Sequence, residues 1–272
     1  MSLPAPSKNG AALITGASAG IGAEIARELA RRGHNVVLVA RSKDKLTALA
    51  RELSEAHGVR AETVSCDLGK PAARGRLPGQ LQKLGLDVEV LVNNAGFATG
   101  GPFHASDPDR ELEQVRLDVE AVVALTSMLL PAMVERRRGA VLNVASTAGM
   151  QPMPFSAGYS AAKAYVLTFS EALHYELAPE GVTVTALAPG PVSTDFWNVA
   201  GWQTTGGQSF EQAVPGPVWV TAQDAARAGV AGLEAGSRVV VPGLPMRAAM
   251  LASRYIPHAI KLPSIAAAMR RR

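Results

Sequence analysis

The feature that most constrains the fold is an alternation, over the first 190 residues, of short apolar runs with longer amphipathic segments. The short runs, such as NVVLVA and VEVLVN, are apolar at nearly every position, which is typical of parallel strands covered by helices on both faces. The longer segments have helical periodicity and end at glycine or proline. Six strand-and-helix repeats predict the α/β class, with a doubly wound parallel sheet in a single domain. The strands are expected at Ala11–Thr15, Asn35–Ala40, Arg60–Ser65, Val88–Asn93, Ala140–Ala145, Thr183–Ala188 and Arg238–Val241.

Composition divides the chain into unequal parts. Residues 1–8 are expected to form a flexible N-terminus, residues 9–243 the folded domain and residues 244–272 a basic C-terminal tail. The segment 195–219 interrupts the domain pattern because it holds all 3 tryptophans and 5 of the 13 aromatic residues. So many aromatic side chains in a loop predict that this loop covers an apolar ligand.

The charge pattern argues against a nucleic-acid partner. The formal net charge is +4, but residues 235–272 carry seven basic side chains and no acidic one, while residues 1–234 hold 20 basic and 23 acidic side chains. The body of the protein therefore lacks the basic surface that a polyphosphate needs. The tail mixes its basic residues with apolar ones, so three interpretations stay open: weak contact with an anionic membrane surface, packing across a dimer, or a mobile end.

Cysteine usage and hydropathy predict a soluble, cytoplasmic protein. The single Cys66 excludes an internal disulfide and a cysteine-rich metal cluster, which suits a reducing compartment. The five histidines are scattered without metal-ligand spacing, so no metal site is expected. The N-terminus has no signal-peptide core, and no stretch offers roughly 18 consecutive apolar residues for a membrane span.

A glycine-rich motif follows the first expected strand and opens directly into a helix. Its sequence, TGASAGIG over Thr15–Gly22, places glycines at positions 16, 20 and 22. Glycine lets the backbone turn sharply and approach a ligand, and the helix N-terminus offers free N–H groups and a partial positive charge to a pyrophosphate. A tight turn without a ligand would use the same residues, so the motif needs support from other positions.

The residues after the second strand indicate which dinucleotide binds. In an NAD site an acidic residue here accepts a hydrogen bond from the ribose 2′-hydroxyl, but this chain reads Ala40, Arg41, Ser42. The guanidinium of Arg41 is a planar fork suited to a phosphate. We therefore expect Arg41, helped by Ser42, to bind the 2′-phosphate of NADP(H). The alternative is an ordinary surface arginine at a strand end.

Three residues downstream carry the expected chemistry. Tyr159 and Lys163 are four positions apart on a predicted helix and share one face, while Ser146 follows the fifth strand. An ammonium about 4 Å from a phenol favours the phenolate by roughly 4 kcal/mol at an effective dielectric near 20, so Lys163 should lower the pKa of Tyr159. These groups predict hydride transfer between a nicotinamide and a carbonyl carbon, in which Tyr159 moves the proton and Ser146 holds the substrate oxygen.

Together the motifs resemble those of the short-chain dehydrogenase/reductase family. TGASAGIG, the NNAG at residues 93–96, Ser146, the YSAAK at 159–163 and the PGPVST at 189–194 occur in the order and spacing of that family, over about residues 9–195. The resemblance is to the 3-oxoacyl and hydroxysteroid reductase branch, and it implies a Rossmann fold with Ser146, Tyr159 and Lys163 as catalytic residues. The expected cofactor contacts are Gly16, Ser18, Ala19, Gly20, Ile21, Gly22, Arg41, Ser42, Asp67, Asn93, Ala95, Gly96, Tyr159, Lys163, Pro189, Gly190, Val192 and Thr194.

One position departs from the family pattern. Members usually carry an asparagine on the long helix before the fifth strand, whereas the segment RLDV here places Asp118 at that point. We add Asp118 to the expected catalytic set. A buried carboxylate near Lys163 would either hold the lysine proton more tightly or have its own pKa raised.

The substrate is expected to be a neutral, apolar ketone or secondary alcohol, acyl-like or steroid-like, because no arginine fork for a carboxylate accompanies the aromatic residues. The same aromatic side chains could instead pack into the core or against a neighbouring subunit. If the usual interface of the family is kept, Asp109–Val134 and Gly158–Ala178 pair across a two-fold axis, giving a homodimer or homotetramer. The expected substrate wall is Ser146, Met150, Phe155, Tyr159, Phe196, Trp197 and Trp202.

These observations favour an NADP(H)-dependent oxidoreductase. The alternatives are a catalytically impaired dinucleotide-binding sensor or scaffold, for which Asp118 is the one argument, and a membrane-surface adaptor working through the tail.

Overall fold

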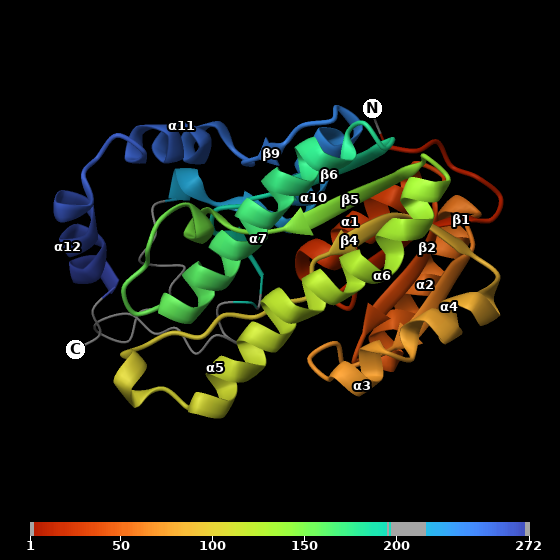
Figure 1. Cartoon of the computed structure of the whole chain (residues 1–272), viewed down its shortest axis with the longest axis horizontal. Coiled ribbons are helices and arrows are strands. Elements are labelled where there is room, and N and C mark those ends of the chain that lie inside the picture. The colour runs from red at the N-terminus through yellow and green to blue at the C-terminus, as the bar shows by residue number, and fades with distance from the viewer. Residues whose placement is uncertain (1–2, 195, 197–215, 270–272) are drawn as a thin grey trace.

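A computed structural model describes residues 3–194, 196 and 216–269 of the chain. Its main sheet has seven strands, all parallel, in the order β3-β2-β1-β4-β5-β6-β9 (Figure 1). This arrangement confirms the predicted doubly wound sheet in a single domain. The strands are β1 (Gly10–Thr15), β2 (Asn35–Ala40), β3 (Ala61–Ser65), β4 (Asp87–Asn93), β5 (Gly139–Val144), β6 (Val182–Leu187) and β9 (Val239–Val240).

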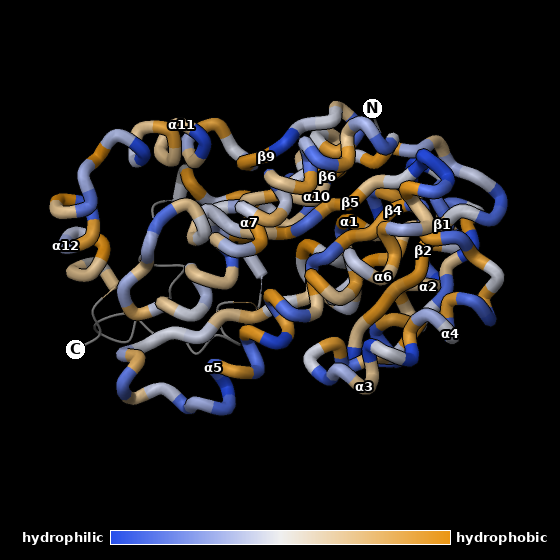
Figure 2. Tube along the Cα trace, viewed as in Figure 1, coloured by the Kyte–Doolittle hydropathy of each residue, from blue (hydrophilic) through white to orange (hydrophobic). Residues whose placement is uncertain are grey.

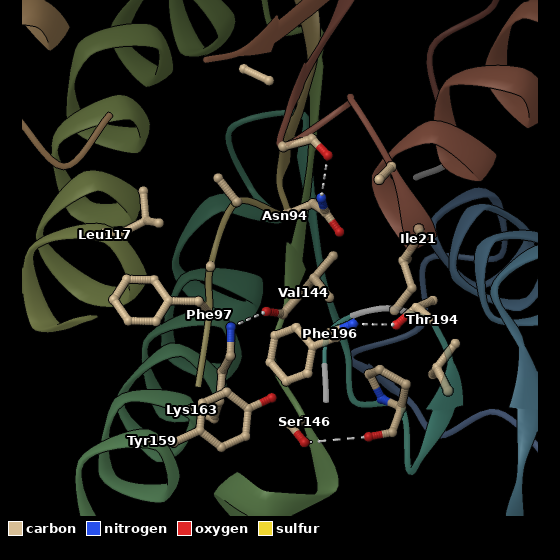
Figure 3. A pocket seen from close by; sticks show the side chains of 18 of the residues that line it. Ile21, Asn94, Phe97, Leu117, Val144, Ser146, Tyr159, Lys163, Thr194 and Phe196 are labelled. Atoms are coloured by element: carbon tan, nitrogen blue, oxygen red, sulfur yellow. Dashed lines mark hydrogen bonds between the residues drawn. The ribbon is translucent and has the colours of Figure 1, made fainter. Parts of the chain in front are cut away.

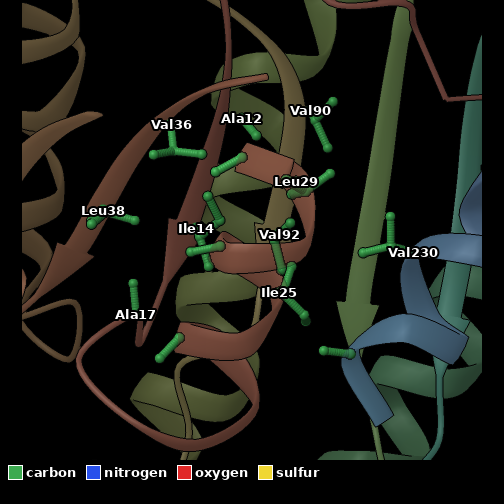
Figure 4. Close-up of a cluster of buried hydrophobic side chains, with 14 of the residues drawn as sticks. Ala12, Ile14, Ala17, Ile25, Leu29, Val36, Leu38, Val90, Val92 and Val230 are labelled. Atoms are coloured by element: carbon green, nitrogen blue, oxygen red, sulfur yellow. The ribbon is translucent and has the colours of Figure 1, made fainter. Parts of the chain in front are cut away.

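Helices cover both faces of the sheet, which explains why the strands are apolar at successive positions. On one face, side chains of α1 such as Ile25 and Leu29 pack with Val230 of α10 against β1 and β4 (Figure 4). On the other face, Leu125 and Leu173 belong to the second core cluster. The first face is covered by α1 (Gly20–Arg31), α2 (Lys43–His57) and α10 (Ala222–Glu234), and the second by α4 (Leu77–Leu84), α6 (Ala121–Glu135) and α7 (Ala157–Leu177).

The strand order reverses between β1 and β4, which are neighbours in the sheet but far apart in the sequence. The chain leaves β1 toward α1 on one face and leaves β4 toward α5 (Pro108–Val115) and α6 on the other. In open α/β sheets the crevice at such a switch point, beyond the carboxyl ends of the strands, is where ligands bind. The fold therefore opens its site at the turns after β1 and β4.

The longest helical stretch, Pro108–Glu135, runs through α5, a π-helical turn η2 (Arg116–Glu120) and α6. By length and composition alone it could cross a membrane. It is nevertheless a layer of the domain, because Leu125 and Met133 are buried in the sheet core. The wider π turn interrupts the regular helix at Asp118. Single π turns inside α-helices are frequent at functional sites.

The ends of the chain contain more order than composition alone predicts. At the N-terminus, the Ser7 hydroxyl donates to Glu89 and accepts from the N–H of Gly10. At the C-terminus, the expected tail contains helices α11 (Leu244–Ser253) and α12 (His258–Met269). Shorter elements are α3 (Pro71–Arg74), η1 (Phe103–Ala105), η3 (Thr147–Met150), η4 (Gly216–Val218) and the pair β7 (Val192–Ser193) and β8 (Val220–Thr221).

Candidate active site

A cavity of about 970 Å³ lies at the carboxyl ends of the strands, at the switch point (Figure 3). Its volume lies within the range of small-molecule and cofactor sites. The structure brings most of the expected site residues to it: Gly16, Ser18, Ala19, Gly20, Ile21, Arg41, Ser42, Asp67, Ala95, Gly96, Ser146, Tyr159, Lys163, Pro189, Gly190, Val192, Thr194 and Phe196.

The turn after β1 is fixed to the turn after β4 by hydrogen bonds. The Thr15 hydroxyl accepts the N–H groups of Asn94 and Ala95 at 2.8 and 3.0 Å, and the Asn94 amide donates to the carbonyl of Thr15 at 2.9 Å. Gly16 has a φ of +64°, and a Cβ there would lie 2.8 Å from the Asn94 amide nitrogen. Glycine is therefore required at this position both for its backbone conformation and for the close approach of the two turns.

Helix α1 begins at the cavity, and no side chain caps its first N–H groups. The residue before it, Ala19, makes no side-chain capping bond. Both Ala19 and Gly20 line the cavity. Free N–H groups at a helix N-terminus, together with the helix dipole, form a natural site for a phosphate or pyrophosphate. This end of the cavity thus fits the charged part of a dinucleotide.

The ends of β2 and β3 bring a set of polar side chains to the far end of the cavity. Arg41, Ser42, Asp67 and Lys70 all line it, and the Arg41 side chain is exposed. The Lys70 ammonium lies 3.7 Å from a carboxylate oxygen of Asp67. Position 41, where an NAD site carries an acid, thus presents a cation to the cavity.

The catalytic candidates meet at the other end. Ser146 begins η3, where its hydroxyl accepts the Ala148 N–H at 3.1 Å and donates to the Pro189 carbonyl at 3.4 Å. The Lys163 ammonium donates to the Val144 carbonyl at 3.1 Å and lies 5.7 Å from the centre of the Tyr159 ring. Because α7 carries both residues one turn apart, their side chains share the pocket, as the spacing predicts (Figure 3).

The electrostatics of Tyr159 differ from the expectation. Burial is the largest effect and raises the pKa of the phenol above its usual value, although the Lys163 ammonium and a hydrogen bond with Ser146 act to lower it. The Asp118 charge raises that pKa further. The Lys163 charge therefore acts on the pKa of Tyr159 in the expected direction, but burial and the Asp118 charge outweigh it, and the pKa lies above its usual value.

Asp118 forms a buried ion pair with the lysine. Its carboxylate oxygen Oδ2 lies 3.3 Å from the Lys163 ammonium, and Oδ1 accepts the Phe97 N–H at 3.0 Å. Burial raises the pKa of the Asp118 carboxyl, against the lowering effects of Lys163 and of the Phe97 N–H. The facing Asp118 and Tyr159 groups outweigh the burial that lowers the pKa of Lys163, so its pKa lies above the ordinary value.

Asp118 contacts the Lys163 ammonium from the side away from the cavity. It is fully buried and is not part of the cavity lining. Its approach depends on Gly96, since a Cβ there would lie 2.8 Å from Oδ1. Asp118 therefore contacts Lys163 and lies outside the cavity lining, unlike the other residues of the expected catalytic set.

Four further expected residues lie outside the cavity lining. Asn93 ends β4 with its amide turned into the core, where it donates to Asn143 at 2.8 Å and Thr126 at 3.1 Å. Gly22 lies inside α1, where a Cβ would meet the Asn94 amide nitrogen at 2.3 Å. Met150 and Phe155 also lie outside the lining, and the expected substrate residues Trp197 and Trp202 fall outside the described part of the chain.

Sequence reasoning missed several residues that do line the cavity. Asn94, the residue that follows β4, lines the cavity, and Met153 lines it whereas Phe155 does not. The chain turns here, because the Ser156 N–H donates to the Met153 carbonyl and Phe155 has a φ of +64°. This turn determines which of the two side chains faces the cavity. The NNAG motif could have indicated Asn94, whereas Met153 has no local signal. Among the other lining residues are Phe97, Arg110, Leu117, Ala148 and Lys70.

The described residues contain no group of three or more histidine, cysteine or acidic side chains that could hold a metal ion. A parallel sheet with its cavity at the switch point, a glycine turn before an uncapped helix, and a serine, tyrosine and lysine at one end are typical of oxidoreductases with a Rossmann fold that bind a nicotinamide cofactor.

Comparison with known proteins gives the family. The family model for short chain dehydrogenases matches residues 10–203, so the chain belongs to the short-chain dehydrogenase/reductase family. It is 37% identical over 194 residues to a very-long-chain 3-oxoacyl-CoA reductase of Anas platyrhynchos, covering 70% of this chain and 62% of that protein. It is 39% identical over 185 residues to a 17-beta-hydroxysteroid dehydrogenase type 3 of Rattus norvegicus, covering 67% and 60%. These relatives confirm the expected branch, and this chain spans about six-tenths of their length.

Solved structures give the same result. A short-chain dehydrogenase from Sphingobium yanoikuyae in complex with NADPH has a TM-score of 0.78 and 33% identity, covering 90% of this chain and 93% of that one. A bulky-bulky ketone specific alcohol dehydrogenase from Comamonas testosteroni has a TM-score of 0.74 and 27% identity, covering 97% and 99%.

Proposed function

We propose that this protein is an NADP(H)-dependent oxidoreductase that interconverts an apolar ketone and the corresponding secondary alcohol. The observation that carries the proposal is the meeting of Ser146, Tyr159 and Lys163 in one cavity with the glycine turn and Arg41. The family membership supports the reaction class, and the NADPH bound by the Sphingobium relative supports the cofactor.

In this proposal the bound dinucleotide supplies or accepts the hydride, and the protein controls the proton. The Ser146 hydroxyl, held at the start of η3, orients the substrate oxygen by a hydrogen bond. The Tyr159 hydroxyl gives its proton to that oxygen during ketone reduction and takes it back during alcohol oxidation. Lys163, anchored on the Val144 carbonyl and on Asp118, places a positive charge beside the phenol and opposes the rise in its pKa.

Preference for NADP(H) over NAD(H) rests on the end of β2. Arg41 and Ser42 line the cavity where the ribose 2′ position is expected, and Lys70 adds a second cation nearby. A 2′-phosphate would find a guanidinium there, whereas a free 2′-hydroxyl would find no carboxylate from position 41.

The apolar character of the substrate rests on the wall beside the catalytic end. Phe196 packs at 5.8 Å from the Tyr159 ring, and Ala98, Ala148 and Met153 complete the same cluster (Figure 3). A carbonyl compound with hydrocarbon on both sides of the reacting carbon would bury that surface in this wall. The relatives named for 3-oxoacyl and hydroxysteroid substrates support acyl-like or steroid-like compounds.

We further propose a homodimer or homotetramer in the cytoplasm. Leu112 and Val115 of α5 and Tyr165 of α7 are about half exposed, on two helices that pack side by side. Exposed apolar side chains gathered in this way are typical of an interface between subunits.

A screen of NADPH oxidation against a panel of ketones, aldehydes and sugars tests the proposal. We expect turnover with bulky apolar ketones, and a fall of about a hundredfold to ten-thousandfold in the Tyr159→Phe variant, because general acid help is lost. Tight NADPH binding with no turnover of any carbonyl compound would instead favour the sensor or scaffold. No observation in the structure favours that alternative.

A further inference from the structure

The two C-terminal helices form a projecting arm, which we define as residues 244–269. Helices α11 and α12 extend from the body of the domain beyond β9 (Figure 1). Among the described elements, α11 lies against η4, and α12 has no substantial packing partner. The arm therefore presents most of its surface to its surroundings.

The arm is attached through one side of α11. The Met246 side chain is buried against Gly190, where a Cβ would lie 2.7 Å from the methionine methyl. About two turns further on, the Ser253 hydroxyl donates to the Gln151 amide oxygen at 2.9 Å, and the Lys261 ammonium donates to the Ser253 carbonyl at 3.1 Å. Gly190 lines the cavity and Gln151 directly follows η3, so the arm is attached beside the catalytic end of the cavity.

The opposite side of α11 is apolar and exposed. Leu244, Ala248 and Leu251 follow one another at spacings of four and three residues, which places them on one stripe of the helix, and Tyr255 follows four residues later in the turn after α11. All four are exposed, Leu244 to 80% and Tyr255 to 84%. The stripe lies opposite the side that carries Met246 and Ser253. In the turn and in α12, Ile256 and Ile260 are further exposed apolar residues. Figure 2 shows hydrophobic residues along both α11 and α12.

The charges that accompany the stripe all have one sign. Arg247 and Arg254 are seven residues apart and lie along one edge of the stripe, and both are exposed. Between residues 235 and 272 there are seven basic side chains and no acidic one. An exposed apolar stripe edged by cations complements a surface that is apolar below and negatively charged above.

We propose that the arm docks on the surface of an anionic lipid bilayer. The stripe of α11 and the adjoining Ile256 and Ile260 enter the boundary of the acyl chains, while Arg247 and Arg254 lie among the headgroup phosphates. Because the arm is attached beside Gly190 and Gln151, docking holds the catalytic end of the cavity near the lipid. The inference rests on the arm alone and does not require the proposed reaction.

Vesicle co-sedimentation of the full chain tests the proposal. We expect binding to vesicles of phosphatidylcholine with phosphatidylglycerol, much weaker binding to phosphatidylcholine alone, and release by salt. Each basic side chain near an anionic surface contributes about fivefold, so the double variant Arg247→Gln, Arg254→Gln should bind on the order of twenty-five-fold more weakly. The matched control Lys45→Gln, Arg51→Gln removes the same charge from exposed positions on α2 and should bind as the wild type does.

A second measurement guards against a variant that merely unfolds. A polarity-sensitive fluorophore on Leu251→Cys should shift to the blue when anionic vesicles are added, whereas one on Lys45→Cys should not; Cys66 is buried and stays unlabelled. Equal vesicle binding by the arm and control variants would overturn the proposal. The proposal would also be overturned if the wild-type chain did not bind vesicles and the arm variants had a different oligomeric state from the wild type. The arm would then contact a second copy of the chain.

Discussion

At the scale of single residues, the pair Asp118 and Lys163 decides how the site handles its proton. An asparagine in this place would contact the lysine without charge, whereas the carboxylate compensates the ammonium at 3.3 Å. The lysine then has less effect on the phenol, and the pKa of Tyr159 stays above its usual value. The site is therefore set to keep the tyrosine proton, which suits the donation of that proton to a ketone.

This electrostatic arrangement predicts a pH dependence. The protonated phenol is needed for reduction, so kcat/KM for a ketone should stay level through neutral pH and fall only at alkaline pH. The phenolate is needed for oxidation, so kcat/KM for the alcohol should rise with pH over the whole neutral range. Steady-state rates in both directions across this range give the measurement, and an oxidation rate already level at neutral pH would contradict the raised pKa.

Asp118→Asn tests the contribution of the carboxylate. Removing its charge removes one of the effects that raise the pKa of Tyr159, so the alkaline rise of alcohol oxidation should move to lower pH, with turnover kept within roughly tenfold or raised. Asp118→Leu, which cannot accept the Phe97 N–H, serves as the comparison for a purely structural loss. A fall of about a hundredfold or more in Asp118→Asn, with the pH profile unmoved, would show that the carboxylate has a chemical role of its own.

Arg41→Ala tests the cofactor assignment. A charge-assisted hydrogen bond contributes roughly 1.5 to 3 kcal/mol, so NADPH affinity should fall about tenfold to a hundredfold while NADH affinity changes little. Titration of both cofactors, followed by fluorescence, measures the two losses. Arg51→Ala, on an exposed part of α2, is the matched control, and equal losses for both cofactors in Arg41→Ala would refute the role of the guanidinium.

At the scale of elements, the site depends on how closely η3 packs on α7. Gly149 of η3 lies against the backbone of Lys163, where a Cβ would come within 2.5 Å of the carbonyl carbon. This contact fixes η3, which Ser146 precedes, on α7, which carries Tyr159 and Lys163. The geometry of the three catalytic candidates is therefore a property of two packed elements.

Gly149→Ala should separate these elements. We expect a loss of about 1 to 3 kcal/mol in the free energy of unfolding, together with a large loss of activity, because the backbones must move apart. Gly79→Ala is the control: it lies in α4 with nothing within 4 Å of an added Cβ, and it should stabilise the protein by roughly 0.5 to 1 kcal/mol. Denaturant unfolding gives both values, and similar free energies for the two variants would contradict the packing argument.

Features that depend on local sequence patterns could be predicted from the sequence, whereas features that depend on packing between distant residues could not. Each of the main strands lies within a residue or two of its expected position, because apolar runs between glycine and proline turns are local signals. The turned-in side chain of Asn93, the exchange of Met153 for Phe155 and the effect of burial on Tyr159 depend on neighbours far away in the sequence. The arm helices were missed because Pro257 and Pro263 interrupt their pattern; in the structure Pro257 lies between the two helices and Pro263 lies inside α12.

At the scale of the whole molecule, different sides of the surface differ in their exposed residues and suit different partners. The side of α5 and α7 carries half-exposed apolar residues and suits a second copy of the chain. The arm carries exposed apolar residues with cations and suits a lipid surface. The cavity opens at the carboxyl ends of the strands, with the arm attached at its catalytic end.

Val115→Glu combined with Tyr165→Glu tests the subunit interface. Burying two carboxylates opposite a second copy should weaken the assembly by about tenfold or more in its dissociation constant and yield monomers in sedimentation velocity. Gln80→Glu, exposed on α4, adds charge elsewhere and should leave the assembly intact. An unchanged sedimentation coefficient in the double variant would place the interface on another surface.

The central claim is that Ser146, Tyr159 and Lys163 direct a hydride from a nicotinamide to a carbonyl carbon in this cavity. The most direct measurement follows deuterium from NADPH labelled at C4 of the nicotinamide into the alcohol formed from a bulky apolar ketone, by mass spectrometry. The account predicts one deuterium on the carbinol carbon with labelled NADPH of one C4 configuration and none with the other, and a strong loss of this transfer in Tyr159→Phe. Alcohol formed without deuterium from either labelled cofactor, or with equal efficiency by Tyr159→Phe, would contradict it.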